Sequence, residues 1–140
     1  MTATKENTLY LPIKQVFFDQ IINGTKLTEE REVKFGITAS RYLMHDGNGE
    51  LVLNPSCTEE DEEYYLDDYN GGKFPFLPKP FKFLQLAVGY HKVRDEALVE
   101  VKDITFKTGR VLGQPPKFAW WIIEFHIGRI INVQRKRVHP

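Results

Sequence analysis

One predicted helix ends at a glycine turn and is followed at once by a short, highly charged strand. Residues 13–22 carry the clearest helix pattern of the chain, because phenylalanine and isoleucine recur four positions apart and form one apolar face. Asn23-Gly24 ends that helix, since glycine adopts the left-handed conformation without a Cβ penalty. Residues 27–33 then alternate in strand fashion and carry glutamates and an arginine. We therefore expect a helix–turn–strand corner that gathers charge.

The rest of the chain is dominated by strand patterns. A bulge is expected near residues 102–103, where the apolar positions change parity. Trp121 falls on the apolar face of the last long strand, and its neighbour Trp120 falls on the other face. Many short strands, one main helix near the N-terminus and no internal repeat predict an α+β fold, a small mixed-sheet barrel. The strands are expected at 8–13, 42–44, 50–53, 81–90, 98–106 and 118–127, with a break at Gly128 before 130–133.

Length and composition predict a single domain that covers residues 1–140. Hydrophobic residues make up 41% of the chain and charged residues 27%, which is ordinary for a soluble globular protein. No apolar run approaches the roughly 20 residues that a membrane span needs, and residues 1–8 lack the apolar core of a signal peptide. Cys57 is the single cysteine, so no internal disulfide can form and a reducing, cytoplasmic location is expected.

An acidic and proline-rich excursion is expected at about residues 55–80. Residues 59–68 hold seven acids and no base, and removing those seven from the 19 acids leaves 12 against 19 bases. Ser56 and Glu59 have the spacing of a capping box, so a short acidic helix over 59–66 is predicted. The excess of basic residues outside this segment is compatible with binding of a polyanionic ligand. It is equally compatible with a role in solubility alone. The acidic segment itself is interpreted as a solvated surface, because its spacing is not that of a calcium loop.

The charged corner carries the pattern G-x-K-x-x-E-x-R at Gly24, Lys26, Glu29 and Arg31. This pattern resembles the signature of the ASCH domain, a family of small β-barrels in the PUA-like superfamily that is related to RNA-binding modules. The resemblance implies a PUA-like β-barrel with a cleft lined by Lys26, Glu29 and Arg31. It extends over roughly residues 8–134, and further similar segments are 11–14, 86–90 and 99–104.

The residues themselves allow two interpretations of this corner. Glu29 and Arg31 lie on the same side of a strand, so they could form an ion pair that locks the corner. They could instead build an anion-binding subsite. Lys26 would bind a phosphate, the planar guanidinium of Arg31 would donate two hydrogen bonds to a phosphate or a base edge, and Glu29 would orient both side chains. Lys14 falls in the first turn of the helix and is either a solvated lysine or, from the resemblance, a cleft residue.

Aromatic and basic residues extend the candidate ligand surface. Single-stranded RNA is held by stacking of its bases on aromatic rings beside a basic track, at about 1–3 kcal/mol per base. Tyr90 and Trp120 are the main candidates for stacking, and Phe118 is a further one. The candidate track consists of Arg129, Arg135, Lys136 and Arg137.

Evidence for an enzyme is weaker. His45, His91, His126 and His139 show no metal-ligand spacing, and no phosphate loop or nucleophile elbow is present, so neither metal nor cofactor is expected.

Some ASCH-like proteins are amidohydrolases that deacetylate acetylated cytidine, and there a threonine stands where this chain has Glu29. Lys26 matches, but Thr28 is one residue away and points to the opposite face of a strand. The expected function is therefore binding of RNA or a nucleotide-like ligand. The alternative is a small hydrolase, an amidohydrolase or ribonuclease, that uses Lys26 with Glu29 or Thr28. A third option is a protein-interaction module that works through the acidic segment.

Overall fold

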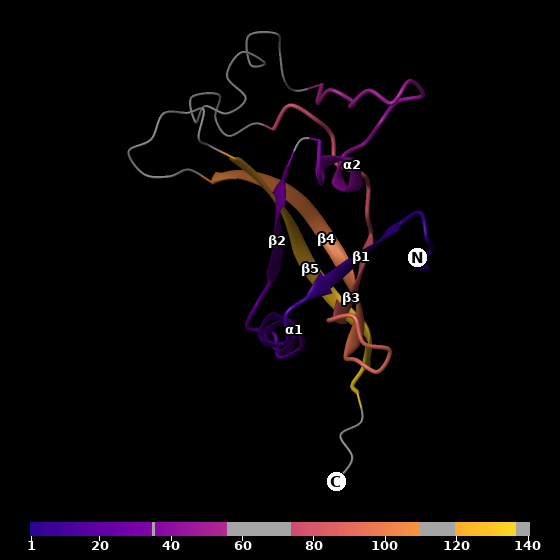
Figure 1. The fold of residues 1–140 in the computed structure, drawn as a ribbon, viewed down its shortest axis with the longest axis vertical. Coiled ribbons are helices and arrows are strands. Elements are labelled where there is room, and N and C mark those ends of the chain that lie inside the picture. The colour runs from indigo at the N-terminus through magenta and orange to yellow at the C-terminus, as the bar shows by residue number, and fades with distance from the viewer. Residues whose placement is uncertain (35, 56–73, 110–119, 137–140) are drawn as a thin grey trace. The chain divides into compact units, whose positions relative to one another are not determined.

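The computed structural model describes residues 1–34, 36–55, 74–109 and 120–136 (Figure 1). Five strands form one sheet in the order β1-β3-β4-β5-β2. β1 pairs with β3 in parallel and β3 pairs with β4 antiparallel, so the sheet is mixed. The predicted class, α+β with a small mixed sheet and one main helix near the N-terminus, is confirmed. The described elements are β1 (Thr8–Ile13), α1 (Gln15–Ile22), β2 (Thr28–Val33), α2 (Ala39–Tyr42), β3 (Phe83–Val88), β4 (Glu96–Gly109) and β5 (Trp120–Gln134).

The chain packs as two compact units. Unit 1 comprises residues 1–29, 80–103 and 125–140, and unit 2 comprises residues 30–79 and 104–124. The long strands β4 and β5 contribute residues to both units. A single domain over residues 1–140 stays a prediction.

The core of unit 1 forms between α1 and the strands β1 and β3. The predicted strand at 8–13 is confirmed as β1, and its burial alternates, with Leu9, Leu11 and Ile13 buried. Phe18 and Ile21 are the buried residues of α1. This alternation follows from the two-residue period of a strand, which directs every second side chain to the same face.

Helix α1 begins two residues later than its sequence pattern suggests. It starts at Gln15 rather than at residue 13, because Ile13 is the last residue of β1 and pairs with Val88 of β3. The predicted end is confirmed: Asn23 is the C-cap and Gly24 has φ of +82°. The Gly24 N–H donates to the Ile21 carbonyl at 3.2 Å, which satisfies one of the open carbonyls of the last turn.

The predicted hairpin of unit 2 is present in a reduced form. The turn over 45–49 is confirmed, since the Asp46 Oδ1 accepts hydrogen bonds from the backbone N–H groups of Asn48 and Glu50. The prediction of strands at 42–44 and 50–53 is wrong. Isolated β-bridges occur there instead, and Tyr42 belongs to α2. Residues 74–80 supply two of the bridge partners, so the proline-rich segment, which cannot donate a full ladder of hydrogen bonds, pairs only residue by residue.

Trp121 lies in the core of unit 2, as predicted. Its side chain is 1% exposed, and the Phe74 ring lies edge-on at 5.1 Å between ring centroids. At the surface of the same unit, the Lys107 ammonium forms ion pairs with Glu30 at 3.0 Å and with Glu124 at 3.6 Å. These contacts link β2, β4 and β5 within unit 2.

The predicted break at Gly128 is wrong. β5 runs without interruption through that glycine, and a Cβ placed there would lie 3.2 Å from the Glu100 Cβ of β4. The glycine therefore permits a close approach of two strands in unit 1 rather than ending one. The parity change predicted for β4 is visible in its burial, since Lys102 and Asp103 are both exposed.

A Gly128→Val substitution tests this close approach. We expect it to lower the free energy of unfolding by about 1–3 kcal/mol, because the added carbons meet the Cβ atoms of Glu100 and Lys102. Urea unfolding of the purified variant measures the effect. Ile131→Val is the matched control on the same strand, where the side chain is 45% exposed and the change should stay within about 0.5 kcal/mol. Equal stability of the two variants would contradict the proposed role of the glycine.

Several sequence predictions fall outside the described residues. These are the acidic helix over 59–66, Phe118 and Arg137, together with the side chain of Trp120. Among the helices that the structure does describe, none has both the length and the apolar character needed to span a membrane.

Candidate functional site

The charged corner places Lys26 and Glu29 together in unit 1. The Lys26 Nζ lies 3.9 Å from the Glu29 Oε1, and it also lies 5.3 Å from the centroid of the Phe17 ring. The Glu29 side chain is buried, whereas the Lys26 side chain is 22% exposed. An ammonium has three donors, so a single ion pair at this distance leaves Lys26 able to contact a further anion.

Burial along β2 follows the predicted alternation. Glu29 and Val33 are buried and Arg31 is half-buried, whereas Glu30 and Glu32 are exposed. Thr28 therefore lies on the other face from Glu29, as the strand pattern predicts. Arg31 belongs to unit 2, where its Nη1 donates to the Glu30 carbonyl at 3.3 Å. A cleft shared by Lys26, Glu29 and Arg31 stays a prediction.

The supporting residues occupy different parts of the chain. Lys14 is the exposed N-cap residue of α1. Tyr90 is 85% exposed and follows Gly89, which ends β3 with φ of +69°. Trp120 begins β5. The Tyr90 ring is available to solvent, as stacking on a ligand requires.

A pocket lined mainly by cations lies in unit 1, and we call it the basic pocket. Its volume is about 490 Å³, within the range of small-molecule sites. Two segments line it: the chain between β3 and β4, and the end of β5. The lining residues are Lys92, Val93, Arg94, Glu96, Gln134, Arg135 and Lys136.

The cations of the basic pocket differ in how far they are already neutralised. The Arg94 Nε donates to the Glu96 Oε1 at 3.0 Å, and its guanidinium lies 5.8 Å from the centroid of the Tyr10 ring. Lys92 and Lys136 are exposed, and their ammonium groups form no ion pair within the described ranges. These two lysines are the charges that the pocket offers to an anion.

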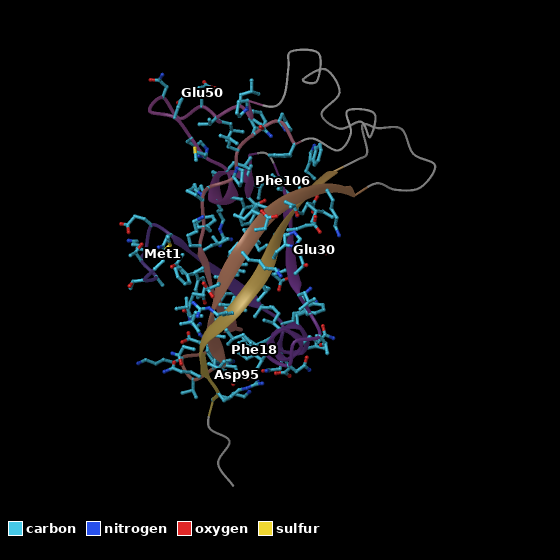
Figure 2. All side chains as sticks on the ribbon, turned by 180° about the vertical axis from the view of Figure 1, so that it is seen from behind. Met1, Phe18, Glu30, Glu50, Asp95 and Phe106 are labelled. Carbon is cyan, nitrogen blue, oxygen red and sulfur yellow. The ribbon has the colours of Figure 1, made fainter. Side chains whose placement is uncertain are left out.

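A buried aspartate holds the end of β5 in place. The Asp95 side chain is 6% exposed, and its Oδ2 accepts hydrogen bonds from Gln15 Nε2 and Arg135 Nη1, both at 2.8 Å. Its Oδ1 accepts the backbone N–H of Lys136 at 2.7 Å. Figure 2 shows Asp95 at the same end of unit 1 as Phe18, and the Arg135 guanidinium lies 5.1 Å from the centroid of the Phe18 ring.

A second pocket of about 460 Å³ adjoins this aspartate, and we call it the carboxylate pocket. It shares Arg135 and Lys136 with the basic pocket. Asp19 of α1 contributes a half-exposed carboxylate, whose Oδ1 accepts from Arg135 Nη1 at 2.7 Å. The lining residues are Gln15, Asp19, Asp95, Arg135 and Lys136.

Both aspartates of the carboxylate pocket are stabilised as anions. Burial opposes ionisation of Asp95, but the hydrogen bonds from Lys136, Gln15 and Arg135 outweigh it and lower the pKa below its ordinary value of 3.8. The hydrogen bonds from Arg135 and Gln15 lower the pKa of Asp19 in the same direction. Near neutral pH the pocket therefore presents two carboxylates.

This pKa shift predicts an acid-dependent loss of stability. A carboxyl whose pKa is lower in the folded state stabilises the fold above its unfolded pKa, and that contribution is lost as pH falls through the folded value. We expect the free energy of unfolding to fall below about pH 4. Urea unfolding between pH 7 and the acid range measures this, with Asp95→Asn as the comparison. If Asp95→Asn were as sensitive to acid as the wild type, the assigned role of this carboxyl would be wrong.

The sequence patterns identified part of this region. Arg135 and Lys136 were expected in a basic track, and both line the basic pocket. Arg129 of the same track instead donates to Glu100 at 2.5 Å. Lys92 and Asp95 were not predicted. The signal for Lys92 was its place in a Gly-containing turn beside Tyr90, but nothing local distinguishes Asp95 from a surface aspartate.

No metal centre is indicated in the part of the chain that the structure describes, where no group of three or more histidine, cysteine, aspartate or glutamate side chains has metal-binding geometry. In comparisons with known proteins, no family model, curated protein or solved structure matches this chain significantly.

Proposed function

We propose that the protein binds single-stranded RNA or a nucleotide-like ligand, with the basic pocket of unit 1 as the phosphate-binding surface. The observation that supports this most is the composition of the pocket. Four cationic side chains and one acidic side chain line a volume of about 490 Å³. Phosphate groups dominate the affinity of proteins for nucleic acids, and lysine and arginine are the residues that bind them.

The charge available to the ligand comes mainly from Lys92 and Lys136. Arg94 and Arg135 are paired with carboxylates at 3.0 and 2.8 Å, so part of their charge is already compensated. The two lysines are exposed compact charges on flexible stems, suited to phosphate oxygens rather than to planar recognition. A ligand with at least two phosphates, or one phosphate between both lysines, fits this arrangement.

Tyr90 favours single strands over duplexes. Its ring is 85% exposed, two residues before Lys92 in the same connection. Bases can stack on an exposed ring only where they are not already stacked and paired in a helix. We propose that Tyr90 stacks a base next to a phosphate held by Lys92.

The charged corner is retained as a second contact region. Lys26 keeps donors beyond its ion pair with Glu29, and Lys14 is exposed at the N-terminus of α1. We propose that these two lysines of unit 1 contact the ligand, Lys26 in the role that the ASCH-like pattern implies. The reducing cytoplasm, where RNA is available, is the proposed location.

A second candidate function is acid–base chemistry on a modified nucleoside. It is favoured by the Lys26–Glu29 pair, in which a buried carboxylate lies 3.9 Å from an ammonium. Release of acetate from acetylated cytidine, and its loss in Lys26→Ala, would support this function. Incubation of the wild-type protein without acetate release would rule out the deacetylase.

A salt titration of RNA binding tests the main proposal. Fluorescence anisotropy of a labelled single-stranded RNA about ten nucleotides long should show binding at low salt that weakens steeply as salt increases, because counterions are released from the phosphates. A blunt duplex of the same length is the control, and it should bind more weakly. The absence of binding to the single strand at about 20 mM salt would overturn the proposal.

A further inference from the structure

The carboxylate pocket lies beside the basic pocket and differs from it in chemistry. Where the basic pocket offers ammonium groups, this one offers carboxylates next to a guanidinium, with Arg135 and Lys136 common to both. A nucleotide has the same two parts, since an anionic phosphate is joined to a base whose edge carries hydrogen-bond donors and acceptors. The adjacency of the two pockets therefore corresponds to a phosphate subsite and a base subsite.

Asp19 keeps an acceptor open to this pocket. Both hydrogen bonds that it accepts within the described residues end on Oδ1, from Gln15 Nε2 at 3.1 Å and from Arg135 Nη1 at 2.7 Å. The Oδ2 is therefore available to a ligand, and the Asp19 side chain is 47% exposed. An ionised carboxylate accepts hydrogen bonds and donates none, so the ligand must supply N–H groups.

The four RNA bases differ in how well they meet this requirement. Guanine presents two adjacent donors, N1–H and the N2 amino group, beside the O6 acceptor. Cytosine and adenine present one amino group each beside a ring acceptor. Uracil presents a single N–H between two carbonyl oxygens, which would meet the carboxylate with repulsion. Asp19 supplies a hydrogen-bond acceptor and the adjacent Arg135 supplies donors. This arrangement complements the guanine edge, where N1–H and the N2 amino group donate and O6 accepts.

We propose that the carboxylate pocket is a base-recognition subsite that selects guanine and rejects uracil, with Asp19 accepting from the base and Arg135 donating to it. This inference rests on the proposed nucleotide-binding function. Asp95 has a different role: it is buried and fully engaged by Gln15, Arg135 and Lys136, so it positions Arg135 and does not contact the base.

Competition by mononucleotides tests the inference on the wild-type protein. Guanosine 5′-monophosphate and uridine 5′-monophosphate are each titrated against the bound, labelled RNA. Their phosphates are identical, so any difference arises from the base. We expect guanosine monophosphate to compete about 10–100-fold better, the usual discrimination of a bidentate base contact.

Asp19→Asn supplies the matched variant. It keeps the shape but replaces one acceptor oxygen by a donor, so the preference for guanosine monophosphate over uridine monophosphate should be lost. Asp103→Asn, an exposed aspartate of β4 in the same unit, is the control for the change in charge. Thermal unfolding of both variants checks that the fold is intact.

The outcomes separate this inference from the proposed function. RNA binding with equal competition by both nucleotides, or with none by either, overturns the base subsite and leaves the RNA-binding function in place. A guanine preference that persists in Asp19→Asn overturns the role of Asp19. Absence of binding to RNA and to both nucleotides overturns the function and the subsite together.

Discussion

Phe18→Ala should lower the free energy of unfolding by about 3–5 kcal/mol, which makes it one of the two largest effects that the structure predicts. The Phe18 side chain is fully buried in unit 1, and the Arg135 guanidinium lies 5.1 Å from the centroid of its ring. Truncation would leave a cavity under α1 and remove the surface on which the arginine rests. Urea unfolding followed by circular dichroism measures this loss of stability. If the Phe18→Ala variant does not fold, the milder substitution Phe18→Leu is measured instead.

Phe17→Ala is the matched control, one residue away on the same helix. Its ring is 39% exposed and contributes mainly the contact with Lys26, so we expect a loss of about 1 kcal/mol or less. If both alanine variants were equally stable, α1 would not pack in the orientation that the structure shows.

The double variant Lys92→Ala/Lys136→Ala should weaken binding of single-stranded RNA by about 10–50-fold at roughly 0.1 M salt. Each lysine–phosphate contact contributes about 0.7 to the slope of log affinity against log salt for single strands, so the slope should become shallower by about 1.4. Anisotropy titrations of the same labelled RNA at several salt concentrations measure both quantities.

The control for this variant removes two lysines elsewhere in unit 1. Lys5→Ala/Lys102→Ala changes the net charge equally, and both side chains are exposed outside the basic pocket. We expect at most a twofold effect on affinity, because neither lysine lines the basic pocket and salt screens exposed charges that do not contact the RNA directly. Equal losses in the two double variants would mean that the RNA senses only overall charge, against the proposed site.

Local sequence patterns predicted most of the fold. The glycine at the end of α1 and the alternation in β2 are properties of neighbouring residues, and both are confirmed. Gly128 misled the prediction, because a glycine in a strand can mark either a break or a close approach. Only the position of Glu100 on the neighbouring strand distinguishes these two cases.

The candidate site was harder to predict, because its residues are distant in the sequence. Asp95 binds Gln15 across 80 positions and Arg135 across 40, and no local pattern encodes such a pairing. Arg135 and Lys136 could be recognised as a basic run, but their pocket depends on the connection that carries Lys92. Lys26 and Glu29 were found because their spacing of three is short enough for a motif to record.

Mapping of RNA contacts by NMR tests the central claim, that the basic pocket of unit 1 binds single-stranded RNA. Backbone amide shifts of ¹⁵N-labelled protein are recorded while a short single strand is added at low salt. The structure predicts that the shifts concentrate at residues 90–96 and 134–136, which line the pocket or adjoin it. Shifts confined to residues 24–31, or none at any position, would contradict it.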